Sequence, residues 1–261
     1  MEARSQYLYI QIAESILEKI EAGELKPHDQ LRSERDLSEE FGVNRLTVRK
    51  ALGMLVSQGV LYRVPSKGTF VSQPKLSQEM NVLIGLSDQL IRSGLQPGAK
   101  VLEISAVPAT RSVAKALQIG EGTAVYYVHR VRYANKEPIA IERTYVPVEY
   151  YRGLKAYDLE NRSLYDIMGR DFGRPVRLAR QGLEPVLATE DEARLLGISQ
   201  PASLMMILRV GLDIDGVPVE YSKDLYRGDR SRFVFMTQNP NAVENASVTT
   251  KTTKGPTKGD K

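Results

Sequence analysis

Two stretches of this sequence repeat each other at a constant spacing of 79 residues. In each, a threonine that can cap a helix precedes a short helical pattern, a turn, a strand-like run with one arginine, and a hairpin. The matched residues are Val107, Ala109, Thr110, Ala114, Leu117, Ile119, Arg130 and Val131 in the first stretch, and Val186, Ala188, Thr189, Ala193, Leu196, Ile198, Arg209 and Val210 in the second. The simplest explanation is duplication of a helix–strand–hairpin unit. This predicts a domain with approximate two-fold symmetry and a cleft between its halves.

The region that holds the repeat, residues 80–238, has the pattern of an antiparallel α+β domain. Runs rich in β-forming residues cover residues 101–107, 124–133, 139–146, 204–212 and 217–226. The pairs Asn135-Lys136 and Asp215-Gly216 separate neighbouring runs and are typical of hairpin turns. Because these runs follow one another instead of alternating with long helices, we expect an antiparallel sheet and not a βαβ fold.

The first part of the chain has a different pattern, which predicts a second domain over residues 7–74. An amphipathic helix is expected over residues 7–22, a short helix after the capping Ser33, and a third helix over residues 45–58, capped by Asn44. A tight turn at 42–44 separates the second helix from the third, and two strand-like runs at 60–64 and 69–72 flank a basic tip. This order predicts a winged helix-turn-helix. A polar segment containing Pro74 predicts a linker, placed at residues 75–79.

Net positive charge in the N-terminal domain lies in its second half. Residues 1–74 carry equal numbers of basic and acidic residues, yet residues 41–75 contain no Asp or Glu. The cations there are Arg45, Arg49, Lys50, Arg63, Lys67 and Lys75. Such a segment suits a surface that faces DNA phosphates, and the alternative is a solvated basic face.

The expected third helix would lie in the major groove. Arg45, at its start, has the reach and the paired donors for a guanine edge, and Arg35 could do likewise. Thr47, Arg49 and the wing residue Lys67 are better suited to phosphates. The alternative is that these residues are ordinary helix residues or solvate a helix face.

Residues 7–73 resemble the DNA-binding domain of the GntR family. The resemblance is carried by residues 23–27 (Gly-Glu-Leu-Lys-Pro), 33–37 (Ser-Glu-Arg-Asp-Leu), 41–52 (from Phe-Gly-Val-Asn-Arg to Lys-Ala-Leu) and 68–71 (Gly-Thr-Phe-Val). It implies base contacts from Arg35, Arg45 and the wing tip, and phosphate contacts from Thr47 and Arg49. The full candidate DNA-binding set is Arg32, Ser33, Arg35, Asn44, Arg45, Thr47, Arg49, Lys67 and Gly68. The chain departs from the family at Arg32, where proline is usual, and at Ser66, where sugar-sensing members carry glycine.

In the second domain, two arginines stand out within an apolar run. Arg130 and Arg132 share a parity and therefore project from one face of their strand. Two guanidiniums on one face repel each other unless an anion lies between them. That anion could be Glu142, Glu220, or a ligand phosphate or carboxylate. The alternative is a structural ion pair on an exposed sheet face.

Residues 80–238 are similar to the UTRA effector domain of the HutC subfamily, whose fold resembles chorismate lyase. The matching motifs are residues 129–132 (His-Arg-Val-Arg), 138–142 (Pro-Ile-Ala-Ile-Glu), 163–166 (Ser-Leu-Tyr-Asp), 183–185 (Leu-Glu-Pro) and 226–230 (Tyr-Arg-Gly-Asp-Arg). Relatives that sense amino-sugar phosphates imply an effector site of Arg130, Arg132, Glu142, Ser163, Tyr165, Glu220 and Tyr226, and the candidate site also includes Gly85, which could offer a backbone N–H, and Leu86. Those relatives carry a hydroxyl-rich Thr-Ser-Phe turn where this chain has Ile84-Gly85-Leu86.

Composition excludes several classes of protein. The chain has no cysteine and only two histidines, so disulfides and thiolate or histidine-rich metal sites are not expected. No apolar run is long enough for a transmembrane helix, and the N-terminus lacks the apolar run of a signal peptide. We therefore expect a cytoplasmic protein without a membrane partner, cofactor, metal or catalytic residues. The polar residues 241–261 predict a disordered tail.

Together these features predict a transcriptional repressor that binds double-stranded operator DNA as a homodimer. A small anionic effector, a sugar phosphate or an organic acid, would control it. One alternative is a chorismate-lyase-like enzyme that uses Arg130 and Glu220. Another is a DNA-binding protein whose second domain only dimerises.

Overall fold

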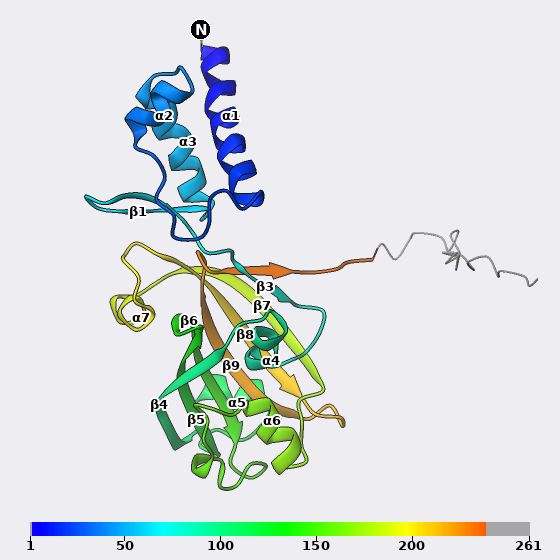
Figure 1. Ribbon diagram of the computed structural model, residues 1–261. Helices are drawn as coiled ribbons and strands as arrows, with labels where there is room; N and C mark the ends of the chain where they lie inside the picture. Colours follow the sequence, from blue (N-terminus) through cyan, green and yellow to red (C-terminus); the bar gives the residue numbers. More distant parts are fainter. Residues whose placement is uncertain (1, 239–261) are drawn as a thin grey trace, which may run out of the picture.

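The computed structural model describes residues 2–238 and consists of a small helical domain and a larger sheet domain (Figure 1). The small domain contains α1 (Glu2–Glu21), α2 (Glu34–Glu40), α3 (Arg45–Ser57), β1 (Leu61–Val64) and β2 (Gly68–Val71). The two strands pair antiparallel as a wing, so the predicted winged helix-turn-helix is confirmed. The first helix begins at Glu2, earlier than the expected residue 7, because the apolar pattern used for the prediction starts inside the helix.

Local signals position the two helices of the helix-turn-helix. Ser33 caps α2 in a capping box, in which its hydroxyl accepts from the backbone N–H of Asp36 and the carboxylate of Asp36 accepts from the backbone N–H of Ser33. Gly42 has a φ of +62°, the left-handed conformation that ends α2 and starts the turn. Asn44 then caps α3. Apolar side chains of α1, α2, α3 and the wing bury one common core.

The larger domain is built on one antiparallel sheet of six strands in the order β4-β5-β6-β9-β8-β7. The strands are β4 (Pro97–Pro108), β5 (Ala124–Ala134), β6 (Glu137–Pro147), β7 (Leu178–Leu187), β8 (Ser203–Leu212) and β9 (Pro218–Arg227). Two short helices, α5 (Arg111–Leu117) and α7 (Glu190–Leu196), follow β4 and β7. Both ends of α7 lie 79 positions after those of α5, and the halves β4-α5-β5-β6 and β7-α7-β8-β9 meet between β6 and β9. The predicted duplicated unit is therefore present in the fold.

Different elements cover the two faces of the sheet. The helices α5 and α7 pack on one face. On the other lie α4 (Leu86–Arg92), the 3-10 helix Leu154–Ala156, α6 (Leu164–Asp166) and the π-helix Ile167–Asp171. Side chains of β5, β6, β8 and β9 that point to this second face are enclosed beneath these helices. Among residues 2–238, no helix combines the length and the apolar character that crossing a bilayer requires.

The segment expected to be a linker contains a strand, which corrects the prediction for residues 75–79. β3 (Leu76–Glu79) pairs in parallel with β10 (Ser231–Val234), and the two lie beside each other where the domains meet (Figure 1). Neither strand has an alternating apolar pattern that would indicate it, and their pairing joins segments about 155 positions apart. The expected tail at 241–261 lies outside the described residues.

Candidate functional site

The start of α3 holds the predicted recognition residues. Asn44 Oδ1 accepts hydrogen bonds from the backbone N–H of Thr47 at 2.8 Å and from its hydroxyl at 3.0 Å. Thr47 is only 6% exposed, and its hydroxyl donates to the capping side chain of Asn44. To donate to a DNA phosphate, this hydroxyl would have to give up its hydrogen bond to Asn44. Arg45, in contrast, forms no salt bridge with any described residue.

Most of the predicted DNA-binding residues surround one hollow between α3 and the wing. Its lining includes Arg32, Ser33, Arg45, Lys67 and Gly68. Arg63, a cation that the prediction left out of its candidate set, lines the same hollow. At Gly68, a Cβ would lie 2.8 Å from Gln30 Nε2, and this amide donates to the backbone carbonyl of Lys67 at 2.6 Å. The wing tip is therefore closely fitted to the loop before α2.

Several arginines of this domain pair with carboxylates, and Arg32 Nη1 lies 3.0 Å from Glu40 Oε2. Arg49 donates to both Glu34 oxygens, with 2.8 Å between its Nη2 and Oε2, and Arg63 Nη2 lies 4.0 Å from Glu34 Oε1. The hydrogen bond from Arg49 holds the pKa of Glu34 below its ordinary value. Arg35 pairs with Glu39 at 3.1 Å on the exposed surface. Glu34 therefore connects the recognition helix to strand β1 of the wing.

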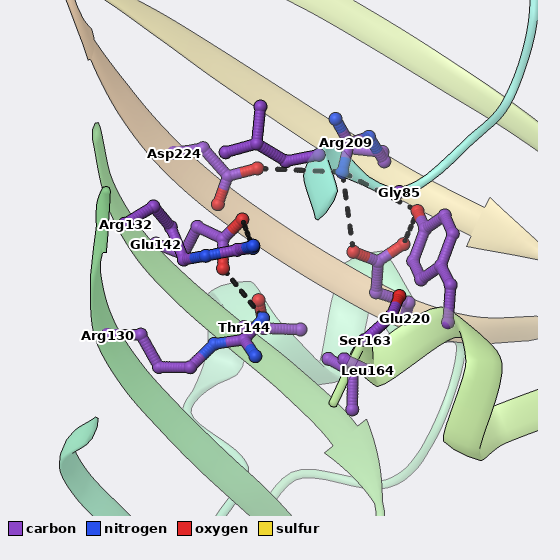
Figure 2. Close-up of a pocket in the computed structure, with 12 residues that line it drawn as sticks. Gly85, Arg130, Arg132, Glu142, Thr144, Ser163, Leu164, Arg209, Glu220 and Asp224 are labelled. Carbon is purple, nitrogen blue, oxygen red and sulfur yellow. Dashed lines mark hydrogen bonds and ion pairs between the residues drawn. The ribbon is translucent and has the colours of Figure 1, made fainter. Parts of the chain in front are cut away.

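In the larger domain, Arg130 and Arg132 of β5 share Glu142 of β6 (Figure 2). Arg130 Nη2 donates to Glu142 Oε2 at 2.7 Å, and Arg132 Nη1 donates to Glu142 Oε1 at 2.8 Å. All three side chains are buried. Of the anions considered from the sequence, Glu142 is therefore the one between the two guanidiniums, and the group is buried instead of lying on an exposed face.

The second half of the repeat supplies the other side of this pocket (Figure 2). Arg209 of β8 is the repeat counterpart of Arg130, and its Nη1 lies 3.7 Å from Glu220 Oε1 and 3.6 Å from Asp224 Oδ2, both on β9. Tyr165 of α6 donates from its hydroxyl to Glu220 Oε2 at 2.7 Å. Glu220 is thus paired with Arg209 and Tyr165, and not with the arginines of β5. Arg209 also donates from Nε to Gln181 Oε1 at 3.1 Å and from Nη1 to the Tyr165 hydroxyl at 3.5 Å.

Four residues of the pocket were missed from the sequence, namely Thr144, Leu164, Arg209 and Asp224. The repeat contained the signal for Arg209, since it matches Arg130 at the spacing of 79. Asp224 lies directly opposite Glu142 across β6 and β9. Nothing local in the sequence encodes that register, because the two strands belong to different halves of the repeat.

The pocket balances three guanidiniums against three carboxylates, which titrate differently. Burial raises the pKa of Asp224 to about 7; Arg209 opposes the rise, and Glu142 and Glu220 add to it. Burial also raises the pKa of Glu220. Burial would do the same at Glu142, but Arg132 and Arg130 hold the pKa of Glu142 below its ordinary value. The positive charge of the site therefore increases as Asp224 takes up a proton.

The pocket is closed by the segments around α4 and α6. Ser163 caps α6, and a Cβ on Gly85 would lie 3.0 Å from Ser163 Oγ, so these two segments approach closely. The candidate effector residues Gly85, Leu86, Ser163 and Tyr165 line the pocket, and its free volume is about 30 Å³. A ligand larger than a single small group therefore requires these segments to move.

Tyr226 does not line this pocket, although it shares a second cavity with Leu86 and Glu142. It lies buried on β9, packs edge-on against Phe233 of β10 with 5.6 Å between ring centroids, and lines a neighbouring cavity. In the described part of the chain, no group of three or more His, Cys, Asp or Glu side chains is arranged to hold a metal ion.

Comparison with known proteins matches both domains. Residues 8–71 match the family described as "Bacterial regulatory proteins, gntR family", and residues 92–232 match the UTRA domain. The HTH-type transcriptional repressor NagR of Bacillus subtilis (strain 168) is 38% identical over 87% of this chain and 93% of NagR. The mannosyl-D-glycerate transport/metabolism system repressor MngR of Escherichia coli (strain K12) is 34% identical over 88% of this chain and 96% of MngR.

Solved structures have the same architecture. PhnF from Mycobacterium smegmatis has a TM-score of 0.63 at 28% identity, over 86% of this chain and 98% of PhnF. YydK from Bacillus subtilis, described as a possible transcriptional regulator, has a TM-score of 0.55 at 26% identity, over 88% of this chain and 99% of YydK. With a gntR-type DNA-binding domain, a UTRA domain and relatives that match along most of their length, the chain belongs to the gntR family of DNA-binding transcriptional regulators.

Proposed function

We propose that this chain is a homodimeric repressor whose hold on operator DNA is controlled by a small anionic metabolite bound between β5, β6, β8 and β9. The observation that carries the effector part is the convergence of Arg130, Arg132 and Arg209 on one buried pocket. Arg209 can bind a new anion, because its contacts to the carboxylates of Glu220 and Asp224 exceed hydrogen-bond length.

A sugar phosphate is the anion that we favour over a plain organic acid. Two relatives are named for sugar derivatives: MngR for mannosyl-D-glycerate, and a probable repressor of Escherichia coli (strain K12), 29% identical, for fructoselysine. Arginines suit a phosphate, while Glu142, Glu220 and Tyr165 suit sugar hydroxyls. At the Ile84-Gly85-Leu86 turn, Gly85 can offer a backbone N–H in place of the hydroxyls carried by related sensors.

On the DNA side, Arg45 and Arg35 read base edges, while Arg49 and Lys67 contact phosphates. Two copies related by a two-fold axis would read the two halves of a symmetric operator. The effector acts by preferring the arrangement of the two heads that does not fit the operator, and operator DNA must then weaken effector binding by the same factor. A protein that binds chromosomal operators works in the cytoplasm.

The experiment is a mobility-shift assay of the full chain on DNA upstream of its own gene. Arg45→Ala should weaken specific binding by about 1–3 kcal/mol, the cost of one bidentate base contact, and should leave the circular dichroism spectrum unchanged. Lys115→Ala, an exposed lysine of α5, is the matched loss of one charge and should bind like the wild type. If the wild type binds no such DNA above background, or if both variants lose affinity equally, the reading role of Arg45 fails.

We propose that the protein is not an enzyme. The competing hypothesis is a chorismate-lyase-like activity that uses Arg130 and Glu220, and turnover of chorismate by the purified protein would establish it. Against that activity, Arg130 is hydrogen-bonded to Glu142 and to the carbonyl of Leu159, and Glu220 is hydrogen-bonded to Tyr165. A hypothesis of dimerisation alone leaves the buried arginines of this pocket without a role.

A further inference from the structure

A second cavity beside the effector pocket differs from it in chemistry. Leu86, Glu142 and Arg209 line both cavities and form the wall between them. Beyond that wall, the second cavity is lined by the carboxamides of Gln78, Gln89 and Gln181 and by the phenol of Tyr226. Apart from the exposed Glu79, this compartment adds no charge of its own to the shared wall.

Two of these carboxamides have unused hydrogen-bonding atoms. Gln78 Nε2 and Gln89 Oε1 are buried, and neither finds a hydrogen-bond partner in the described part of the chain. Gln78 is only 4% exposed. Buried polar atoms are almost always paired, so an unpaired donor and an unpaired acceptor in one cavity indicate a missing partner. A hydroxyl or a carboxamide is such a partner, because each can accept one hydrogen bond and donate another.

The size and the lining of the cavity suit a small neutral group such as a hydroxyl or a carboxamide. Its free volume is about 30 Å³, which suits one small polar group and not a second sugar ring. Met80, Val82 and Leu83 give it an apolar rim. We propose that this cavity is a second subsite, in which a neutral hydroxyl or carboxamide of the effector bonds to Gln78 and Gln89 while the anionic group lies among the arginines. This inference rests on the effector role proposed above.

The location of Gln78 gives the subsite a regulatory meaning. Gln78 is part of β3, the strand that follows the DNA-binding domain, and is paired with Phe233 of β10. A ligand that fills only the arginine pocket does not contact β3, whereas one that reaches Gln78 does. The neutral group therefore connects the effector directly to the segment that joins the two domains.

The test is calorimetric titration of the full chain with hexose phosphates of equal charge. The probes are glucose 6-phosphate and its 2-, 3- and 4-deoxy analogues. Gln78→Met removes the unpaired donor and should leave the melting temperature of the unliganded protein unchanged, because no hydrogen bond is lost. The substitution should lower the affinity for glucose 6-phosphate by about five- to tenfold, which corresponds to the loss of one hydrogen bond. One deoxy analogue should escape this loss, since it already lacks the hydroxyl that Gln78 binds. Ser77→Ala, at an exposed position of β3, is the control.

If Gln78→Met lowers the affinity for all four hexose phosphates equally, or for none of them, Gln78 does not bind a hydroxyl of the ligand and the proposed subsite is wrong. If the wild type binds operator DNA but none of the hexose phosphates, the subsite for hexose phosphates is overturned, whereas the proposed role as a DNA-binding regulator is retained. If the wild type binds neither DNA nor probe, the proposed function itself fails.

Discussion

At the scale of single residues, the pocket places two carboxylates directly opposite each other. Glu142 and Asp224 are cross-strand partners on β6 and β9, and both are buried. Like charges in that position destabilise a sheet. The two arginines of β5 neutralise Glu142, but Asp224 has only Arg209 at 3.6 Å, which it shares with Glu220, and a hydrogen bond from Ser222 at 3.0 Å. Asp224 therefore keeps its proton to about pH 7, where Glu142 is ionised.

This arrangement predicts how Asp224→Asn changes stability with pH. As pH rises above the ordinary aspartate pKa, the unfolded chain loses its proton while the folded protein keeps it. The wild type then loses stability, relative to the neutral asparagine, at about 1.4 kcal/mol per pH unit. The loss stops near pH 7, where folded Asp224 also ionises. We expect urea unfolding at pH 5, 6, 7 and 8 to show that the free energy of unfolding of the variant, relative to that of the wild type, increases up to about pH 7. Above pH 7 the difference should stay constant. Glu121→Gln, at an exposed carboxylate, is the control, and parallel curves for wild type and Asp224→Asn would refute the prediction.

The proximity of residues within one hairpin was predictable from the sequence. The proximity of residues on β6 and β9, where the two copies of the repeat join, was not. Parity placed Arg130 and Arg132 on one face, and the adjacent strand brought Glu142 to them. Asp224 reaches the same pocket only through the pairing of β6 with β9, which joins the two copies of the repeat. Sequence periodicity describes which face a residue is on, but not which distant strand lies beside it.

At the scale of elements, the turn of the wing departs from its preferred sequence. Ser66 has a φ of +61°, the left-handed conformation in which a side chain is strained. The resemblance to sugar-sensing GntR members implies glycine at this point, and here the conformation is kept although the residue is serine. The turn is held by the Gln30 amide on Lys67 and by the backbone bond from Lys67 N–H to Val64 O at 3.0 Å.

Ser66→Gly should therefore stabilise the DNA-binding domain. Relief of the strain outweighs the extra entropy of glycine in the unfolded chain, for a net gain of about 0.5–1 kcal/mol. Urea unfolding followed through the helical signal of this domain would measure the gain. Ser57→Gly, the same substitution at the end of α3, should lower stability, because glycine is unfavourable in a helix. A loss of stability at both sites would contradict the strain argument.

Long elements with a buried face were predictable, whereas edge and short elements were not. The central strands β5, β6, β8 and β9 have strong β-forming runs, and the prediction located them. β7 is an edge strand whose side chains are mostly exposed, so it lacks the apolar pattern of a buried strand. β3 and β10 have four residues each, and each depends on the other for its hydrogen bonds.

At the scale of the whole molecule, one arginine fastens the segment between the domains. Arg230 donates to the carbonyls of Gln73 and Pro74 and to Gln73 Oε1, and its Nη2 lies 2.9 Å from Glu137 Oε2. Lys75 adds a hydrogen bond to the carbonyl of Gly228 at 2.9 Å. The polar segment after the wing is therefore fixed to the sheet domain by several hydrogen bonds.

Arg230→Ala should separate the two functions of the protein. Cleavage by a non-specific protease within residues 72–80 should rise about tenfold, since the segment opens more often without its clamp. Operator affinity should stay within about twofold, while the effect of an effector on that affinity is lost, because the coupling needs a fixed connection. Arg232→Ala, at an exposed position of β10, is the matched control. Coupling that survives in Arg230→Ala would show that it runs by another route.

The parallel pairing of β3 with β10 also has a consequence for synthesis of the protein. The two strands are about 155 positions apart, so at about 5–20 residues per second β10 is made roughly 8–30 s after β3. Throughout that interval the nascent chain already contains a complete DNA-binding domain, but the strand that ties it to the sensor has no partner. A ribosome that stalls before residue 231 therefore leaves a DNA-binding head without this strand pairing, and under the proposed function the growing chain acquires control by a metabolite after it acquires the ability to bind DNA.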